Sequence, residues 1–265
     1  MNRSMKFLAA LAPLVAFSPV AAQSGAPVVA VLAFENGSFG KDSKDYDGIG
    51  KGIMDIMITD LASSSKVRVV DRERVQSILA EQNLTKSGAV DGATAVRVGK
   101  LMGACYSIYG TFMRGPTGDN ILTVHTTSNE TGQIQNAIKV PSKGDDVMEL
   151  IAKASAQFAS SVDVKACPGT AGTSRPGDAA ATQQGAAPAA ASKTVEYARP
   201  LPPEERKKLE NVKLDARTML IYSRALDAKD RKEKAKAVAL FQQVIDRKPD
   251  FTPAKTQLDA LNSGS

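Results

Sequence analysis

The sequence predicts an α/β protein, with a mixed β-sheet, helices packed on it, and a small helical hairpin at the C-terminal end. Three observations lead to this fold class. Apolar, β-branched runs alternate with stretches of helical periodicity through residues 27–113, a pattern typical of parallel strands joined by helical crossovers. Two strand-like runs around a short turn then predict an antiparallel hairpin. Beyond residue 200 the periodicity is helical.

The first half of the chain supplies the expected crossover units. Pro27–Phe34 is apolar and rich in valine, as in a buried strand, and from Ile49 to Leu61 the apolar positions fall on one helical face. The same alternation of strand-like and helix-like patterns then repeats further along the chain. It predicts a strand at Lys66–Asp71, a helix through Val75 and Leu79, a helix at Thr94–Met102 and a strand at Cys105–Met113.

The sheet is expected to close with an antiparallel edge. Ile121–Thr127 and Gln133–Val140 flank the turn residues Asn129–Gly132, which is the signature of a hairpin. A helix that begins at Asp145 keeps its apolar residues on one face, so it should cover the sheet.

Composition divides the rest of the chain. Residues 167–200 are mostly Ala, Gly, Pro and Thr, a linker composition that buries too little apolar surface to order itself. We therefore expect a disordered linker between an α/β domain at residues 23–166 and a separately folded tail at 201–263. The tail should hold helices at Arg206–Lys229, Lys232–Lys248 and Thr252–Leu261.

Residues 1–22 have the pattern of a secretory signal peptide. Arg3 and Lys6 precede a short apolar stretch that ends in Val20-Ala21-Ala22, so cleavage should leave Gln23 at the mature N-terminus. This predicts a periplasmic protein. No cysteine lies at the junction, so we expect no lipid anchor.

The net charge of +6 does not indicate a nucleic-acid partner. The basic excess lies in residues 199–248, where acidic residues are interspersed as on a solvated helix face. The chain also has no tryptophan. We therefore expect protein partners from the envelope and no nucleic acid.

The sequence offers little catalytic or ligand-binding chemistry. Its single histidine, His125, falls in the predicted hairpin without a nucleophile motif, which indicates an exposed strand residue. Gly48–Gly52 lacks the spacing of a phosphate loop, and its glycines are expected to form a turn into the helix. Asp42, Asp45 and Asp47 lack the spacing of a calcium loop. We predict no enzymatic activity, no cofactor and no metal site.

The two cysteines, Cys105 and Cys167, leave two alternatives open. Export to an oxidising compartment favours a disulfide between them. A buried thiol at Cys105, inside the apolar run Ala104–Phe112, and an unrelated thiol at Cys167 explain the sequence equally well.

Three segments in order resemble the curli-secretion component (CsgG) family. They are Val28–Asn36, Val69–Gln82 and Gly99–Gly110. The resemblance covers about Pro27–Val164 and implies a CsgG-like α/β domain on the periplasmic side of an outer membrane. Pore-forming members of that family insert two hairpins per subunit, whereas this chain offers one, Ile121–Val140, whose centre is continuously polar. We therefore expect no membrane insertion, and leave a homo-oligomer open.

The tail resembles a tetratricopeptide half-repeat at Ala237, Phe241, Val244 and Pro249. A partner-binding groove and a helical hairpin that packs on itself are equally consistent with these four residues. For the whole chain the leading hypothesis is a non-enzymatic binding or scaffold protein of the periplasm. The alternatives are a curli-type secretion component of the outer membrane and an accessory regulator of a cell-wall synthase.

Overall fold

The computed structural model describes residues 26–64, 66–82, 84, 91–142, 144–161 and 195–263. The predicted signal segment, Cys167 and most of the predicted linker lie outside these ranges. Within them no helix combines the length and the apolar character that crossing a membrane requires.

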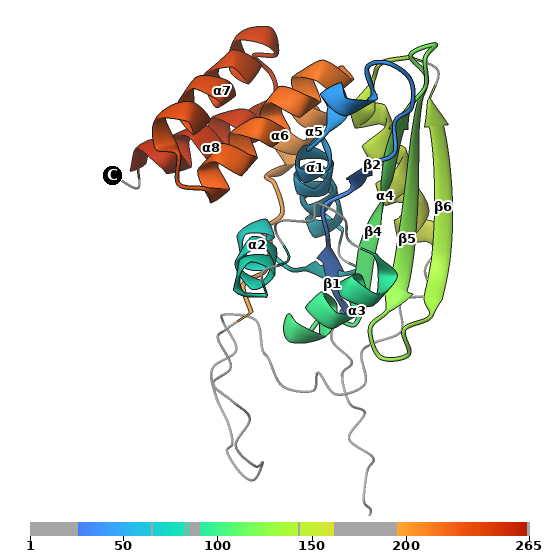
Figure 1. Ribbon diagram of the computed structural model, residues 1–265. Helices are drawn as coiled ribbons and strands as arrows, with labels where there is room; N and C mark the ends of the chain where they lie inside the picture. The colour runs from blue at the N-terminus through green and yellow to red at the C-terminus, as the bar shows by residue number, and fades with distance from the viewer. Residues whose placement is uncertain are drawn as a thin grey trace, which may run out of the picture.

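The α/β domain follows the predicted order of elements (Figure 1). Its strands are β1 (Val28–Val31), β2 (Glu35–Asn36), β3 (Arg68–Val69), β4 (Tyr106–Arg114), β5 (Asn120–Ser128) and β6 (Ile134–Ser142). Its helices are the short 3-10 turn η1 (Ser43–Tyr46), α1 (Gly50–Ala62), α2 (Arg72–Glu81), α3 (Gly92–Leu101) and α4 (Val147–Ser161).

The predicted parallel strands and the predicted antiparallel hairpin belong to one mixed sheet. Its strand order is β3-β1-β4-β5-β6, and β2 pairs with the far end of β4. β1 runs parallel to β3 and β4, as crossover connections require. β4, β5 and β6 are antiparallel, with Gly110 opposite Val124 and Val124 opposite Ile138. The predicted mixed α/β fold is confirmed.

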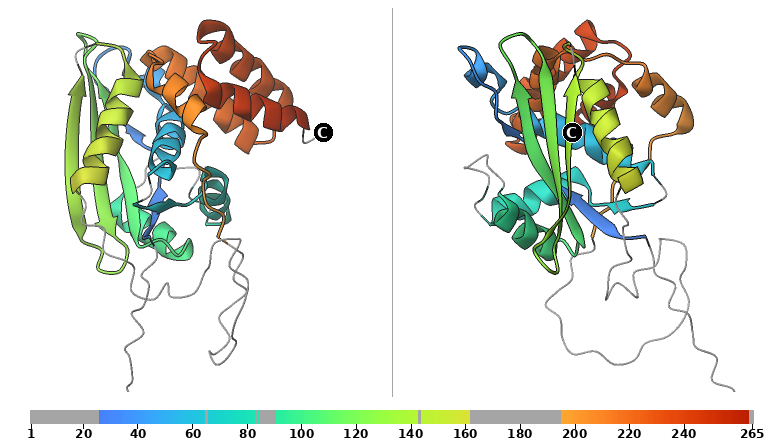
Figure 2. Two further views of the ribbon diagram at one scale, coloured as in Figure 1. Left: turned by 180° about the vertical axis from the view of Figure 1, so that it is seen from behind. Right: turned by 90° about the vertical axis from the view of Figure 1, so that its right-hand side faces the viewer.

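Helices cover the two faces of the sheet unequally (Figure 2). α1 and α4 pack on the face whose buried side chains include Ile108, Phe112 and Leu122. α3 packs on the opposite face of β4, where Ser107 Oγ donates to the Ala95 carbonyl at 2.9 Å. Leu150, Ile151, Ala154 and Phe158 of α4 are buried, so the predicted covering role of this helix is confirmed.

The tail contains four helices, and its first predicted helix is divided. α5 spans Pro203–Glu210, α6 Ala216–Asp230, α7 Lys234–Arg247 and α8 Thr252–Ser263. The single helix expected at Arg206–Lys229 is wrong because Asp215 caps α6. Its carboxylate accepts from the Thr218 amide at 2.9 Å and from the Thr218 hydroxyl at 2.7 Å.

The last residues of the predicted linker are ordered. Tyr197 forms a β-bridge with Val70, and the Ala198 amide donates to the Val69 carbonyl at 2.9 Å. The Arg68 guanidinium lies 3.8 Å from the centre of the Tyr197 ring. The predicted boundary at residue 200 is therefore too late, since backbone pairing and one aromatic side chain fix this stretch against the domain.

The sequence predicts a tail that folds separately from the α/β domain. In the structure the tail instead packs against that domain. α6 lies along α1 in both views (Figures 1 and 2). Ser223 Oγ of α6 accepts from the Gly52 amide and donates to the Ile49 carbonyl, both at 2.8 Å. A Cβ atom on Gly52 would lie 2.5 Å from Ser223 Oγ, so the close approach of the two helices depends on this glycine.

A buried polar network joins the two parts. The Tyr222 hydroxyl donates to Asp55 Oδ2 at 2.6 Å, and Arg72 Nε lies 3.2 Å from Asp55 Oδ1. Arg72 Nη1 also donates to Asp230 Oδ1 at 2.9 Å, while Lys51 contacts both Asp230 and Asp227. Burial raises the pKa of Asp55, against the opposing effect of Arg72 and the Tyr222 hydroxyl. Charged residues from α1, α2 and α6 thus stabilise one interface.

Candidate functional site

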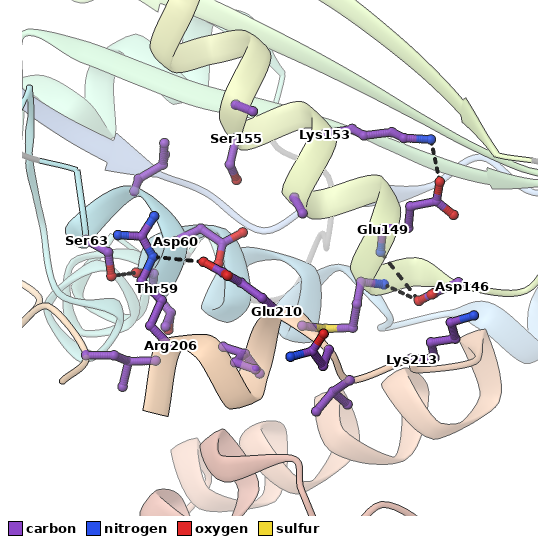
Figure 3. A pocket seen from close by; sticks show the side chains of 18 of the residues that line it. Thr59, Asp60, Ser63, Asp146, Glu149, Lys153, Ser155, Arg206, Glu210 and Lys213 are labelled. Atoms are coloured by element: carbon purple, nitrogen blue, oxygen red, sulfur yellow. Dashed lines mark hydrogen bonds and ion pairs between the residues drawn. The ribbon is translucent and has the colours of Figure 1, made fainter. Parts of the chain in front are cut away.

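A groove of about 1110 Å³ lies between α4 and α5 in the described residues, with the C-terminal half of α1 as its floor (Figure 3). Its apolar lining includes Met148, Ala152, Ala156, Leu209 and Val212. We call it the α4–α5 groove. Because α4 belongs to the α/β domain and α5 to the tail, the groove exists through the docking of the two parts.

Amphipathicity positions the α4 wall. Its large apolar residues face the sheet, which leaves Ala152 and Ala156 exposed toward the groove. The α5 wall is held through Leu209 and Val212, which are buried. The groove thus has small alanine side chains on its α4 wall, and its α5 wall is fixed by the buried side chains of Leu209 and Val212.

Two aspartates at the start of α4 fix one end of the groove. Asp146 Oδ1 accepts from the Met148 amide at 3.1 Å, a cap of the helix, and from the Leu214 amide at 3.3 Å. Asp145 Oδ1 accepts from the Ala216 amide at 3.0 Å, and both its oxygens contact Arg114. The turn between α5 and α6 is therefore bound to the α/β domain.

Ion pairs neutralise most of the charge on the rim. Lys153 donates to Glu149 at 2.5 Å along α4, and Arg206 Nε lies 3.2 Å from Glu210 along α5. Figure 3 shows both pairs at the edges of the groove. Such exposed pairs contribute little to stability, but they leave few free charges for a partner to meet.

Asp60 of α1 is a lining carboxylate that makes no ion pair with a described residue. It lies on the groove floor between Ser155 of α4 and the Arg206–Glu210 pair (Figure 3). Burial raises its pKa to about 6, because nearby Ser155 and Arg206 offset the desolvation only in part and Glu210 opposes ionisation. The Ser155 hydroxyl makes no hydrogen bond of ordinary geometry to a described residue, although it lies close enough to lower the pKa of Asp60.

The predicted tetratricopeptide-like residues do not line the α4–α5 groove. Ala237, Phe241 and Val244 are fully buried, and the Phe241 ring packs edge-on against Tyr222 at 5.9 Å between centroids. Pro249 is exposed in the turn between α7 and α8. These residues build the core of the tail, and their assignment to a tetratricopeptide-like motif stays a prediction.

Of the two cysteines, Cys105 lies within the described residues. Cys105 precedes β4 and is disulfide-bonded, so the described part of the chain holds no free thiol. Cys167 lies outside the described residues. The pairing of Cys105 with Cys167 therefore stays a prediction.

His125 is half-buried, not exposed as predicted. It lies on the outer face of β5, with its ring 5.5 Å from that of Tyr109, and its Nδ1 has no hydrogen-bond partner among the described residues. The difference arises because Tyr109, directly opposite in the antiparallel register, covers the ring.

Other parts of the chain pack directly against the glycine-rich segment Gly48–Gly52. Gly48 has a positive φ of 89°, as predicted for a turn. A Cβ atom on Gly50 would lie 1.6 Å from the Phe34 carbonyl oxygen, and α6 covers Gly52. Two of the glycines thus serve packing, and Ser223 takes an amide that an anion would need at this helix N-terminus.

Asp47, one of the three aspartates ahead of α1, accepts from the Asn36 side chain at 2.7 Å. The described residues contain no cluster of three or more His, Cys, Asp or Glu side chains arranged for a metal ion.

Sequence reasoning missed Asp60 and Ser155. Both stand on helices that the apolar periodicity predicts, and a carboxylate next to Leu61 in an apolar helix was a signal that a polar contact lies nearby. What the pattern does not show is that α1 and α4 bring the two side chains to one groove, because the contact joins helices far apart in sequence.

Comparison with known proteins supports the family resemblance. The model of the curli production assembly/transport component CsgG matches residues 15–114, which confirms a CsgG-like domain in the chain. The match ends with β4, so the hairpin, α4 and the tail lie beyond it. No curated protein sequence matches the chain.

Several solved structures are similar at low identity. The LpoB C-terminal domain from Escherichia coli is 16% identical, with 45% of this chain and 84% of that one covered and a TM-score of 0.36. Lipoprotein GNA1162 from Neisseria meningitidis is 14% identical, with 51% and 98% covered and a TM-score of 0.38.

Proposed function

We propose that the chain is a non-enzymatic binding or scaffold protein of the cell envelope, exported to the periplasm without a lipid anchor, and that it holds a protein partner in the α4–α5 groove. The observation that carries the proposal is the groove itself, built jointly by the CsgG-like domain and the docked tail. The predicted signal segment at residues 1–22 supports export.

The dimensions of the groove suit a segment of a protein. Its volume, about 1110 Å³, exceeds the range of roughly 300–1,000 Å³ typical of small-molecule sites. Its exposed α4 wall carries small side chains, which allow a helix backbone to approach closely. Helix-in-groove docking of this kind is a recurring mode of peptide recognition.

Crosslinking in intact cells tests the proposal. A photo-crosslinking amino acid replaces Ala156 on the groove wall or, as a matched control, Lys139 on the exposed strand β6. We expect one envelope protein to crosslink from Ala156 and not from Lys139. Equal capture from both positions, or none from Ala156, would contradict a groove-mediated interaction.

The same crosslinks separate the two alternatives from the sequence. A curli-type secretion component would crosslink to copies of itself, whereas an accessory regulator would crosslink to a cell-wall synthase. Mass spectrometry of the product identifies the partner. Fractionation of the cells tests the placement, because a chain without a lipid anchor should leave with the osmotic-shock fluid.

A further inference from the structure

We propose that the partner segment is an amphipathic helix with a Lys or Arg side chain on its apolar face, and that this cation pairs with Asp60 on the floor of the α4–α5 groove. The inference rests on the proposed function and deepens it, since it states the chemistry that the groove selects. Three features of the groove carry it.

The first feature is a carboxylate that makes no direct ion pair, although the charge of Arg206 acts on it. Five described residues that line the groove carry a carboxylate, and four of them have a polar partner within the protein: Asp145 has Arg114, Asp146 has backbone amides, Glu149 has Lys153 and Glu210 has Arg206. Asp60 makes no ion pair with any described residue and is partly buried. A carboxylate in this position is stabilised when a cation is supplied from outside.

The second feature is a buried hydroxyl at the same place. Ser155 is 7% exposed and lines the groove, and its Oγ lies near the Asp60 carboxylate without a hydrogen bond of ordinary geometry to a described residue. Figure 3 shows its side chain directed from α4 toward Asp60. An ammonium or guanidinium group carries several N–H donors, so one cation can donate to both oxygens.

The third feature is the shape and neutrality of the surroundings. Ala152, Ala156 and Ala159 recur on one face of α4 at the spacing of successive helical turns and line the groove. Opposite them lie the apolar side chains of Leu209 and Val212. Because Asp145, Glu149 and Glu210 already have cationic partners, Asp60 is the lining carboxylate left for a basic residue on an otherwise apolar occupant.

A bound metal ion fits this site less well. Asp60 and Ser155 supply a carboxylate and a hydroxyl, whereas divalent calcium takes six to eight oxygen ligands. The described residues offer no third acidic or histidine side chain in a suitable cluster. An organic cation on a protein segment satisfies the two groups without further ligands.

The test is a selection of displayed random 16-residue peptides on the purified full chain. Selected peptides are measured by fluorescence anisotropy against wild type, Asp60→Asn and Ala156→Tyr. Asp60→Asn keeps the shape of the side chain and removes its charge, while Ala156→Tyr fills the groove from an exposed helix position. Circular dichroism verifies that both variants are folded.

We expect the selected peptides to carry one Lys or Arg among apolar residues at helical spacing. Asp60→Asn should weaken their binding about tenfold or more, the usual size of a lost charge-assisted contact. Replacing the basic residue by norleucine should cost the same on wild type and less than about threefold on Asp60→Asn, because the two changes remove one interaction.

The outcomes separate this inference from the proposed function. Some selected peptides could lose binding to Ala156→Tyr and yet lack a basic residue, or bind Asp60→Asn as tightly as wild type. That result would contradict the pairing of a cation with Asp60 but would still support binding in the groove. Peptides that bind Ala156→Tyr as tightly as wild type, or a selection that yields no peptide, would contradict both groove binding and the cation pairing. Self-association of the chain that Ala156→Tyr abolishes and that the selected peptides inhibit would show that a second copy is the occupant, which also contradicts the inference.

Discussion

Replacing Arg72 by methionine should destabilise the protein by about 3–5 kcal/mol, the usual cost of removing one partner from a buried ion pair. Methionine keeps much of the length of the side chain, so the change removes the charge with little loss of packing. Arg72 is buried at 3% exposure, and its guanidinium contacts Asp55 on α1 and Asp230 on α6. Its loss leaves Asp55 buried without a cation in contact.

The size of the effect follows from the surroundings of Asp55. Burial is the largest influence on its pKa and opposes its charge, and Arg72 is the strongest influence in the other direction. The Tyr222 hydroxyl alone then stabilises the carboxylate from within contact distance. Asp230 is less affected, because Lys51 lies 3.2 Å from it and it is more exposed.

Urea unfolding followed by circular dichroism measures the change, with Arg97→Met on the exposed face of α3 as the matched control. The control should stay within about 0.5 kcal/mol of wild type. The double variant Asp55→Asn with Arg72→Met should recover part of the loss, with a coupling of about 1–3 kcal/mol, because no uncompensated charge remains. Equal midpoints for Arg72→Met and Arg97→Met, or strictly additive effects in the double variant, would refute the reasoning.

Three further predictions follow from single features. Gly52→Val should lower the unfolding midpoint in urea strongly, because even its Cβ atom would lie 2.5 Å from Ser223 Oγ, whereas Gly115→Ala should be tolerated since its nearest neighbour is at 3.7 Å. Asp60→Asn should stabilise the chain above pH 6 by on the order of 1–2 kcal/mol, and this gain should vanish as the pH falls below about 4. The reason is that burial raises the pKa of Asp60 in the folded chain from 3.8 to about 6, so this carboxyl group opposes folding only when it is ionised. A gain in stability that does not change with pH would contradict this. N-terminal sequencing of exported protein should begin at or near Gln23, and retention of Met1 would contradict export through a cleaved signal.

Local patterns were sufficient for the α/β domain. The valine-rich run at Val28–Val31 indicated a strand buried on both faces, and it lies between β3 and β4 in parallel register. The turn residues after Ser128 marked the hairpin. These features depend on residues close in sequence, which is why periodicity and turn chemistry locate them.

The docking of the tail depends on residues far apart in sequence, and no periodicity reports such a contact. Ser223 and Tyr222 were polar members of an otherwise apolar helical stripe, and Asp55 was a carboxylate inside an apolar helix. Each is a local inconsistency that a buried polar partner resolves. The sequence shows that partners are needed, but it does not identify Asp55 as the acceptor for Tyr222.

The groove and the interface between the two parts are mechanically linked, because Asp145 and Asp146 line the groove and also bind the turn between α5 and α6. α5 is attached to the α/β domain through the Asp145 and Asp146 contacts at its C-terminal side. The next helix, α6, is held on α1 by Ser223 and the Arg72 network. A change that releases α6 from α1 thus removes one of the two supports of the α5 wall and leaves the Asp145 and Asp146 contacts as the other. A partner bound across α4 and α5 must in turn stabilise the docked tail, because it binds the docked state in preference to the released one.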